Sequence, residues 1–81
     1  MKIDVKMFAA ARQYTSQAVV QVELDNPACV ANLKQALLEQ FPALGPLANH
    51  LLIAVDNDYA EDDCPLDEKS EIAVIPPVSG G

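Results

Sequence analysis

The chain has 81 residues, enough for one domain near the lower limit at which a core without crosslinks is stable. Twelve Asp and Glu residues against five Lys and Arg give a formal net charge of -7, which repels a phosphate backbone and an anionic membrane surface. These numbers exclude nucleic acid and membranes as partners. No apolar run approaches the roughly 20 residues that span a bilayer, so we expect a cytoplasmic protein.

The acidic residues concentrate in the second half of the chain, where Lys69 is the one local cation. They are Asp56, Asp58, Glu61, Asp62, Asp63, Asp67, Glu68 and Glu71. Such a region predicts a basic protein surface as its complement.

Two alternating segments open the chain. From Lys2 to Phe8, apolar residues alternate with polar ones, which is typical of a half-buried strand and places Phe8 on the outward face. Residues 9–17 are expected to form a turn or loop. A second strand is expected over residues 20–24, and the two strands are predicted to form a hairpin.

A helix is expected next. It begins either at Asn26 with Pro27 in the first helical position, or later, near Cys29. Its buried stripe recurs at helical spacing and consists of Val30, Leu33, Ala36, Leu37 and Phe41. Pro42 ends the helix, and Gly45-Pro46 predicts a loop.

Three further strands are predicted after the helix. Residues 51–56 alternate, a brief strand is expected around Tyr59-Ala60, and residues 64–70 form a connection. Glu71 to Ile75 make the last strand, with Ile75 facing outward like Phe8. This order predicts an α+β fold of the β-grasp type, in which one helix crosses a mixed sheet. Residues 1–75 form the domain and residues 76–81 an extended tail.

The tail is the most unusual segment. Pro76 and Pro77 fix φ and cannot donate to a sheet, so they are expected to end the strand and to project the last four residues on a stiff stalk. These residues, Val78, Ser79, Gly80 and Gly81, have little side-chain bulk, which suits passage through a narrow channel in another protein. A frayed Gly-Gly end is the competing interpretation, and the preceding Pro-Pro-Val disfavours it.

The carboxylate of Gly81 is a weak electrophile until it is adenylated. The chain has no phosphate-binding loop of its own, since its three glycines lie in no G-x-x-x-x-G-K pattern. We therefore interpret the chain as a carrier or substrate whose catalytic side chains belong to partners.

The residues resemble a known family, the small subunit of molybdopterin synthase. The likeness lies in residues 8–12 (Phe-Ala-Ala-Ala-Arg), residues 52–55 (Leu-Ile-Ala-Val) and residues 65–81, and it spans essentially the whole chain. The closing strand and tail, residues 71–81, are its most specific part. Departures such as Gln13, which comes after Arg12 where an acid is usual, do not touch the tail.

The resemblance implies a ubiquitin-like sulfur carrier for molybdenum cofactor biosynthesis. An activating enzyme related to the E1 class would adenylate Gly81 with ATP and Mg²⁺, and a sulfur donor would convert the adenylate to a thiocarboxylate. The large subunit of molybdopterin synthase would then accept the tail, and the sulfur would pass to a pterin precursor to build the dithiolene. No cofactor or metal is expected to stay bound to this chain.

A docking surface is expected beside the tail. Phe8 and Ile75 lie on strands that are neighbours in a β-grasp sheet, both on the face that the helix leaves open, and Tyr59 joins them by the resemblance. Arg12 either binds an acid of a partner or anchors its own loop; the sequence leaves both open.

Other reactive side chains are given no role. Cys29 and Cys64 are interpreted as free thiols that pack into the fold, although a persulfide at Cys29 is conceivable chemically. His50 lacks companions at ligand spacing. Asp62-Asp63 lacks the spaced acids of a calcium loop.

Two other functions share the fold and the Gly-Gly end. A sulfur carrier for thiamine synthesis is disfavoured by residues 8–12 and by Pro76-Pro77. A ubiquitin-like modifier joined to lysines through Gly81 stays open, because an activated glycine also reacts with amines.

Overall fold

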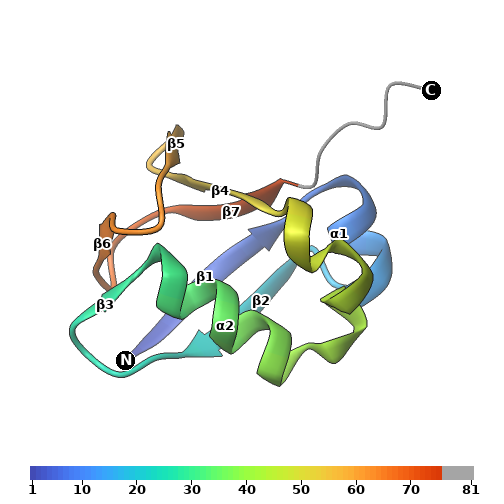
Figure 1. The fold of residues 1–81 in the computed structure, drawn as a ribbon, viewed down its shortest axis with the longest axis horizontal. Helices are drawn as coiled ribbons and strands as arrows, with labels where there is room; N and C mark the ends of the chain where they lie inside the picture. The colour runs from blue at the N-terminus through green and yellow to red at the C-terminus, as the bar shows by residue number, and fades with distance from the viewer. Residues whose placement is uncertain (76–81) are drawn as a thin grey trace.

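The computed structural model describes residues 1–75, apart from the side chains of residues 48 and 49. It consists of one five-stranded sheet, a two-stranded ribbon and three helical segments (Figure 1). The strands are β1 (Lys2–Met7), β2 (Val19–Glu23), β3 (Ala28–Cys29), β4 (Leu52–Val55), β5 (Asp58–Ala60), β6 (Pro65–Leu66) and β7 (Ile72–Ile75). The helical segments are α1 (Ala9–Thr15), α2 (Val30–Gln40) and the 3₁₀ segment η1 (Pro42–His50).

The main sheet has the strand order β2-β1-β7-β4-β5. β1 and β7 run parallel at its centre, and every other neighbouring pair is antiparallel. The first and last strands therefore lie side by side, as predicted. With α2 crossing one face (Figure 1), this is the ubiquitin-like β-grasp fold, and the predicted fold class is confirmed.

Alternation explains the burial of the sheet. Ile3 and Val5 in β1 and Val22 in β2 are fully buried, and Val74 in β7 is too. These side chains pack against α2 in one core cluster. Each large aliphatic side chain that is fully buried stabilises the fold by ~1.5–3 kcal/mol relative to leaving it exposed. The alternate positions form the outer face of the sheet, which α2 does not cover.

The start of α2 settles the choice that the sequence left open. Cys29 is the N-cap residue, so the helix begins late and not at Asn26. The Cys29 amide donates to the side-chain oxygen of Asn32 at 2.9 Å, one half of a capping box. The stripe of Val30, Leu33, Ala36 and Leu37 is buried, and Pro42 comes after the last turn because proline cannot continue a helix.

A short ribbon holds the first turn of α2. β3 pairs with β6, and the amides of Val30 and Ala31 donate to the backbone carbonyls of Cys64 (3.0 Å) and Asp62 (2.9 Å). Two of the free amides of the helix N-terminus are thereby satisfied. Lys34 adds an ion pair with Asp62 at 2.8 Å.

Three expectations for the connections were wrong or incomplete. Residues 9–17 were expected to be a loop, and seven of them form α1. The segment around Gly45-Pro46 is the 3₁₀ helix η1 and not an irregular loop. Residues 64–70 contain the two-residue strand β6, which exists because β3 offers it a partner.

The brief strand around Tyr59 is present as β5. The predicted tail, Pro76 to Gly81, lies outside the described residues. No helix in residues 1–75 is long and apolar enough to cross a membrane.

Candidate functional site

The outer face of the sheet carries a groove beside the end of β7. It has a volume of about 260 Å³. We call it the outer groove. The residues that line it are Lys6, Phe8, Ala54, Asn57, Tyr59, Glu71, Ile72, Ala73 and Ile75. Three of the four residues predicted to form the docking surface, Phe8, Tyr59 and Ile75, are thus brought together from three different strand regions.

Strand register explains why these residues meet. Lys6 lies opposite Ala73, Ala73 opposite Ala54, and Ala54 opposite Tyr59, so the four form one row across β1, β7, β4 and β5. Side chains directly opposite each other in neighbouring strands are in contact range. The adjacent row pairs Ile75 with Leu52.

Phe8 is held firmly although its side chain is half exposed, at 47%. Its amide donates to the Val74 carbonyl at 3.2 Å and so extends the ladder of β1 and β7. Its carbonyl accepts the amides of Ala11 (3.1 Å) and Arg12 (3.4 Å), which begins α1. The backbone of Phe8 therefore has partners on both sides, and the ring is presented from a fixed position.

The turn after Phe8 requires an uncommon backbone conformation. Ala9 has a φ of 48°, in the left-handed region that residues other than glycine rarely adopt. Strained positions often mark functional sites, and this one comes directly after a predicted docking residue.

Arg12 lies in the last turn of α1 and does not line the outer groove. Its side chain is exposed. Within residues 1–75, the ion pairs are Lys2 with Glu23 and Lys34 with Asp62, so no described carboxylate anchors Arg12. Its role as a docking residue stays a prediction.

Sequence reasoning missed part of the exposed apolar face. Leu52 is 45% exposed and pairs with Ile75. Val19 is 48% exposed and lies opposite Lys6. The alternation of residues 51–56 already assigned Leu52 to the face of Ala54, but the sequence did not show that its neighbour would be Ile75.

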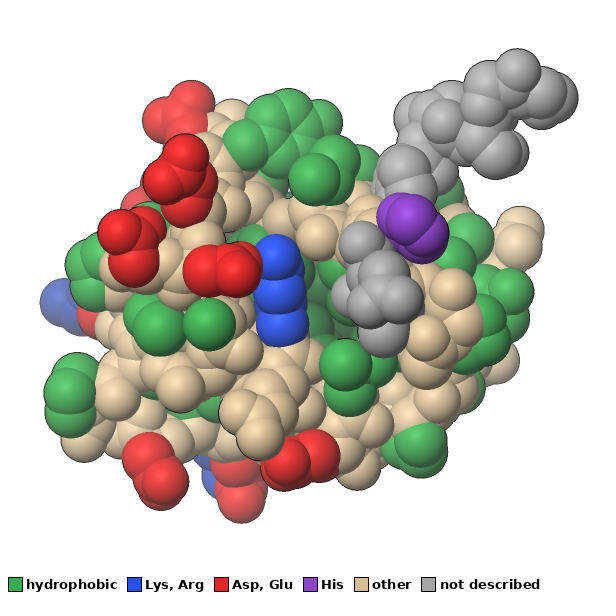
Figure 2. Space-filling model, in the orientation of Figure 1, with side chains coloured by type: hydrophobic (Ala, Val, Ile, Leu, Met, Phe, Trp, Pro, Cys, Tyr) green, Lys and Arg blue, Asp and Glu red, His purple; other side chains and the backbone are tan. Residues whose placement is uncertain are grey.

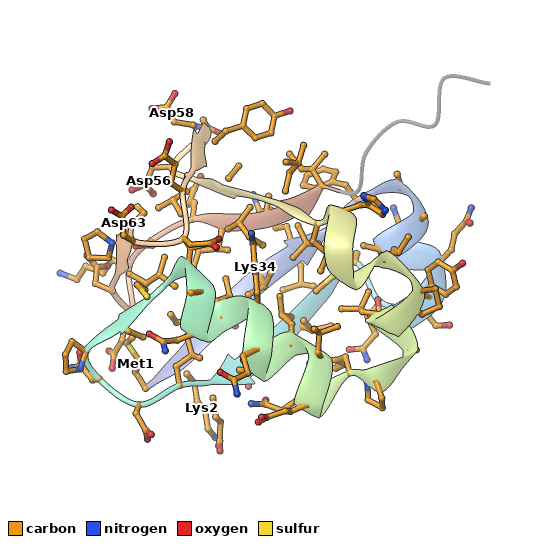
Figure 3. The ribbon with its side chains drawn as sticks, in the orientation of Figure 1. Met1, Lys2, Lys34, Asp56, Asp58 and Asp63 are labelled. Carbon is orange, nitrogen blue, oxygen red and sulfur yellow. The ribbon has the colours of Figure 1, made fainter. Side chains whose placement is uncertain are left out.

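Acidic side chains cluster at the end of the molecule opposite η1. Figure 2 shows them over the end that carries β5 and β6. In Figure 3, Asp56, Asp58 and Asp63 lie at this end, whereas Lys34 on α2, the ion-pair partner of Asp62, lies nearer the middle of the view. No three His, Cys, Asp or Glu side chains of the described residues form a group suited to a metal ion.

Cys29 and Cys64 are both half-buried free thiols. The Cys29 thiol donates to the Asn32 side-chain oxygen at 3.1 Å, and Cys64 packs against the core. Their contacts fit the structural interpretation.

The family model described as the ThiS family matches residues 5–81. The chain belongs to the ThiS family. It is 35% identical over 83 residues to the molybdopterin synthase sulfur carrier subunit of Caenorhabditis briggsae, covering 100% of this chain and 99% of the relative. The resemblance to the small subunit of molybdopterin synthase is confirmed.

Solved structures agree on the fold. SAMP1 from Haloferax volcanii, the small archaeal modifier protein 1, superposes on the chain with a TM-score of 0.85 at 26% identity, and 100% of both chains is covered. A chain from the complex of subunits 1 and 2 of the molybdopterin-converting factor of Helicobacter pylori has a TM-score of 0.70 at 21% identity, again over 100% of both chains. This second likeness supports the fold alone.

Proposed function

We propose that the chain is the sulfur carrier subunit of a molybdopterin synthase. One observation carries the proposal most directly: a relative with this function aligns with the chain over its whole length. The structure adds a second support, because the outer groove lies along β7 and reaches Ile75, the residue before the predicted tail.

The chemistry proposed for Gly81 needs no catalytic side chain from this protein. The terminal carboxylate attacks the α-phosphorus of ATP, pyrophosphate leaves, and an acyl-adenylate forms. Hydrosulfide released by the sulfur donor then attacks the carbonyl carbon, AMP leaves with the bonding electrons, and the product is a thiocarboxylate. The activating enzyme would supply ATP, Mg²⁺ and the groups that stabilise both transition states.

This scheme requires three partners. They are the activating enzyme, a sulfur donor and the large subunit of molybdopterin synthase, which would take the thiocarboxylate to a pterin precursor. The outer groove is the proposed docking surface, since exposed apolar side chains beside a reactive terminus favour protein contact. The acidic end of the molecule favours partners with basic surfaces. A cytoplasmic location is part of the same proposal.

The test is intact-mass spectrometry after incubation with the activating enzyme of the same organism, ATP and a sulfur source. The proposal predicts that one oxygen of the chain is replaced by sulfur, and that a chain lacking Gly81 stays unmodified. An unmodified wild-type chain with a competent enzyme, or equal modification of the shortened chain, would show that the proposal is wrong.

A second candidate is a protein modifier, and the likeness to the small archaeal modifier protein 1 favours it. The same acyl-adenylate reacts with an amine, and the result would be an isopeptide bond between Gly81 and a lysine. Tryptic digests of cell extract would then contain lysines that carry a remnant of the tail. A carrier for thiamine synthesis has less support, because the relative from Caenorhabditis briggsae is a molybdopterin synthase subunit. Recovery of a thiazole synthase with the tagged chain would favour the thiamine function.

A further inference from the structure

The floor of the outer groove is made of two alanines. Ala54 and Ala73 lie opposite each other on β4 and β7, and larger side chains flank them: Phe8, Ile75 and Tyr59. Ala54 is 7% exposed although it points away from α2, so its neighbours rise above it. The missing bulk in the middle of the row creates a hollow suited to one long side chain.

The rim of the hollow is chemically divided. Phe8 and Ile75 form an apolar side, Tyr59 supplies an aromatic ring at the β5 end, and Glu71 supplies a carboxylate on the polar side. Lys6 stands at the opposite, β1 end of the row. An occupant therefore meets apolar surface along its length, the carboxylate of Glu71 and, at the β1 end, the ammonium group of Lys6.

The position of Glu71 is fixed by its backbone. Its amide donates to Oδ1 of Asp56 at 2.9 Å, and its carbonyl accepts the Asp56 amide at 2.8 Å. Among the residues that line the groove, Glu71 is the one carboxylate. Its charge favours a cation beside it, whereas Lys6, opposite Ala73 on β1, disfavours one at the β1 end.

We propose that the outer groove binds one arginine side chain of the large synthase subunit, an inference that rests on the proposed function. The aliphatic stem lies over Ala54 and Ala73, as long cationic side chains commonly lie on apolar surface. The guanidinium pairs with Glu71 and contacts the ring of Tyr59. Arginine fits better than lysine, because its planar head both stacks on a ring and pairs with a carboxylate through two bonds.

The first experiment measures the affinity of the purified large subunit for carrier variants by calorimetry. Glu71→Gln removes the negative charge in the groove, and Glu68→Gln makes the same change outside it. We expect Glu71→Gln to weaken binding about tenfold, which corresponds to ~1.4 kcal/mol, and Glu68→Gln to change it little. Equal affinities for the two variants would refute the proposal.

A second pair of variants tests whether the space above Ala54 and Ala73 is needed for binding. Ala73→Leu fills the hollow, and Ala31→Leu adds the same bulk at an exposed position of α2. We expect the first to weaken binding about tenfold or more and the second to leave it unchanged. Circular dichroism checks that both fold; if Ala73→Leu is misfolded, the Glu71 and Glu68 pair still decides the question.

A double-mutant cycle then identifies the arginine. Each exposed arginine of the large subunit is changed to Gln and tested against wild-type carrier and Glu71→Gln. For one arginine the double variant should bind no more weakly than either single variant, because the interaction is already lost. Independent, additive losses for every arginine would overturn the proposal.

The thiocarboxylation assay separates this inference from the proposed function. All four carrier variants should accept sulfur when the activating enzyme is in excess, because their tails are unchanged. If wild type accepts sulfur and Glu71→Gln binds like Glu68→Gln, the arginine site is wrong and the carrier function stands. If wild type neither accepts sulfur nor binds the large subunit, the proposed function fails and the arginine site fails with it.

Discussion

The same substitution at two adjacent positions should have opposite effects on stability. Ala9 has a φ of 48°, a conformation that is costly for alanine and free for glycine. Ala9→Gly should therefore raise the free energy of unfolding by about 1 kcal/mol. Its methyl group is exposed, so little packing is lost.

Ala10 is the matched control. It lies one residue further along in α1, and its φ is not positive. Glycine at this position therefore costs backbone entropy without relieving strain. Ala10→Gly should lower the free energy of unfolding by ~0.5–1 kcal/mol. The two variants should differ by roughly 2 kcal/mol.

Thermal unfolding monitored by circular dichroism measures the difference. For a domain of this size, 1 kcal/mol shifts the midpoint by about 4–8 °C, so the variants should melt about 10 °C apart, with wild type between them. Urea unfolding supplies an independent value. If Ala9→Gly is as destabilising as Ala10→Gly, the left-handed turn after Phe8 is absent and the account of how Phe8 is positioned is wrong.

Three further predictions concern other elements. Gln40→Ala should lower the free energy of unfolding, measured by urea titration, by about 1 kcal/mol, because the side-chain oxygen and nitrogen of Gln40 both hydrogen-bond the backbone of β2. The control Gln35→Ala removes one exposed hydrogen bond of 3.5 Å and should change the free energy of unfolding little. Cys29→Ser should hold or raise the melting temperature, because serine is a preferred N-cap residue, and should leave thiocarboxylate formation unchanged; loss of sulfur loading would instead support a persulfide role. Asp62→Asn should lower the free energy of unfolding by ~0.5 kcal/mol, since its ion pair with Lys34 is largely exposed. Asp63→Asn should lower it less, and urea unfolding of both variants measures the difference.

The elements predicted correctly are those with a regular burial pattern. Alternation identified β1, β2, β4 and β7, and helical spacing identified α2, because in each the sequence repeats the period of the structure. The order of these elements then indicated the β-grasp fold. The side-by-side placement of Phe8 and Ile75 came from that topology.

The missed elements are those that tertiary contacts create. In α1 one residue, Ala11, is buried, so no hydrophobic stripe indicates the helix. Its first residue, Ala9, also has a conformation normally associated with glycine. β3 and β6 have two residues each, too few for a period, and exist because the chain brings them together.

The candidate site was predictable in its large side chains and not in its small ones. Phe8 and Ile75 were identified as outward-facing apolar residues and Tyr59 through the family resemblance, whereas Ala54 and Ala73 give no signal in a sequence. Their importance appears when strand register sets them opposite each other. The groove is formed by residues on neighbouring strands, so its shape could not be predicted before the strand pairing was known.

Recognition and chemistry are therefore assigned to different parts of this chain. The outer groove lies over β7, which pairs with β1 on one side and β4 on the other, so the strands that carry its lining residues are held in a fixed register up to Ile75. Residues 76–81 carry almost no side-chain chemistry with which to discriminate partners. Because specificity is a difference of contact energies, we infer that the groove selects the partner and that the terminal carboxylate supplies the reaction.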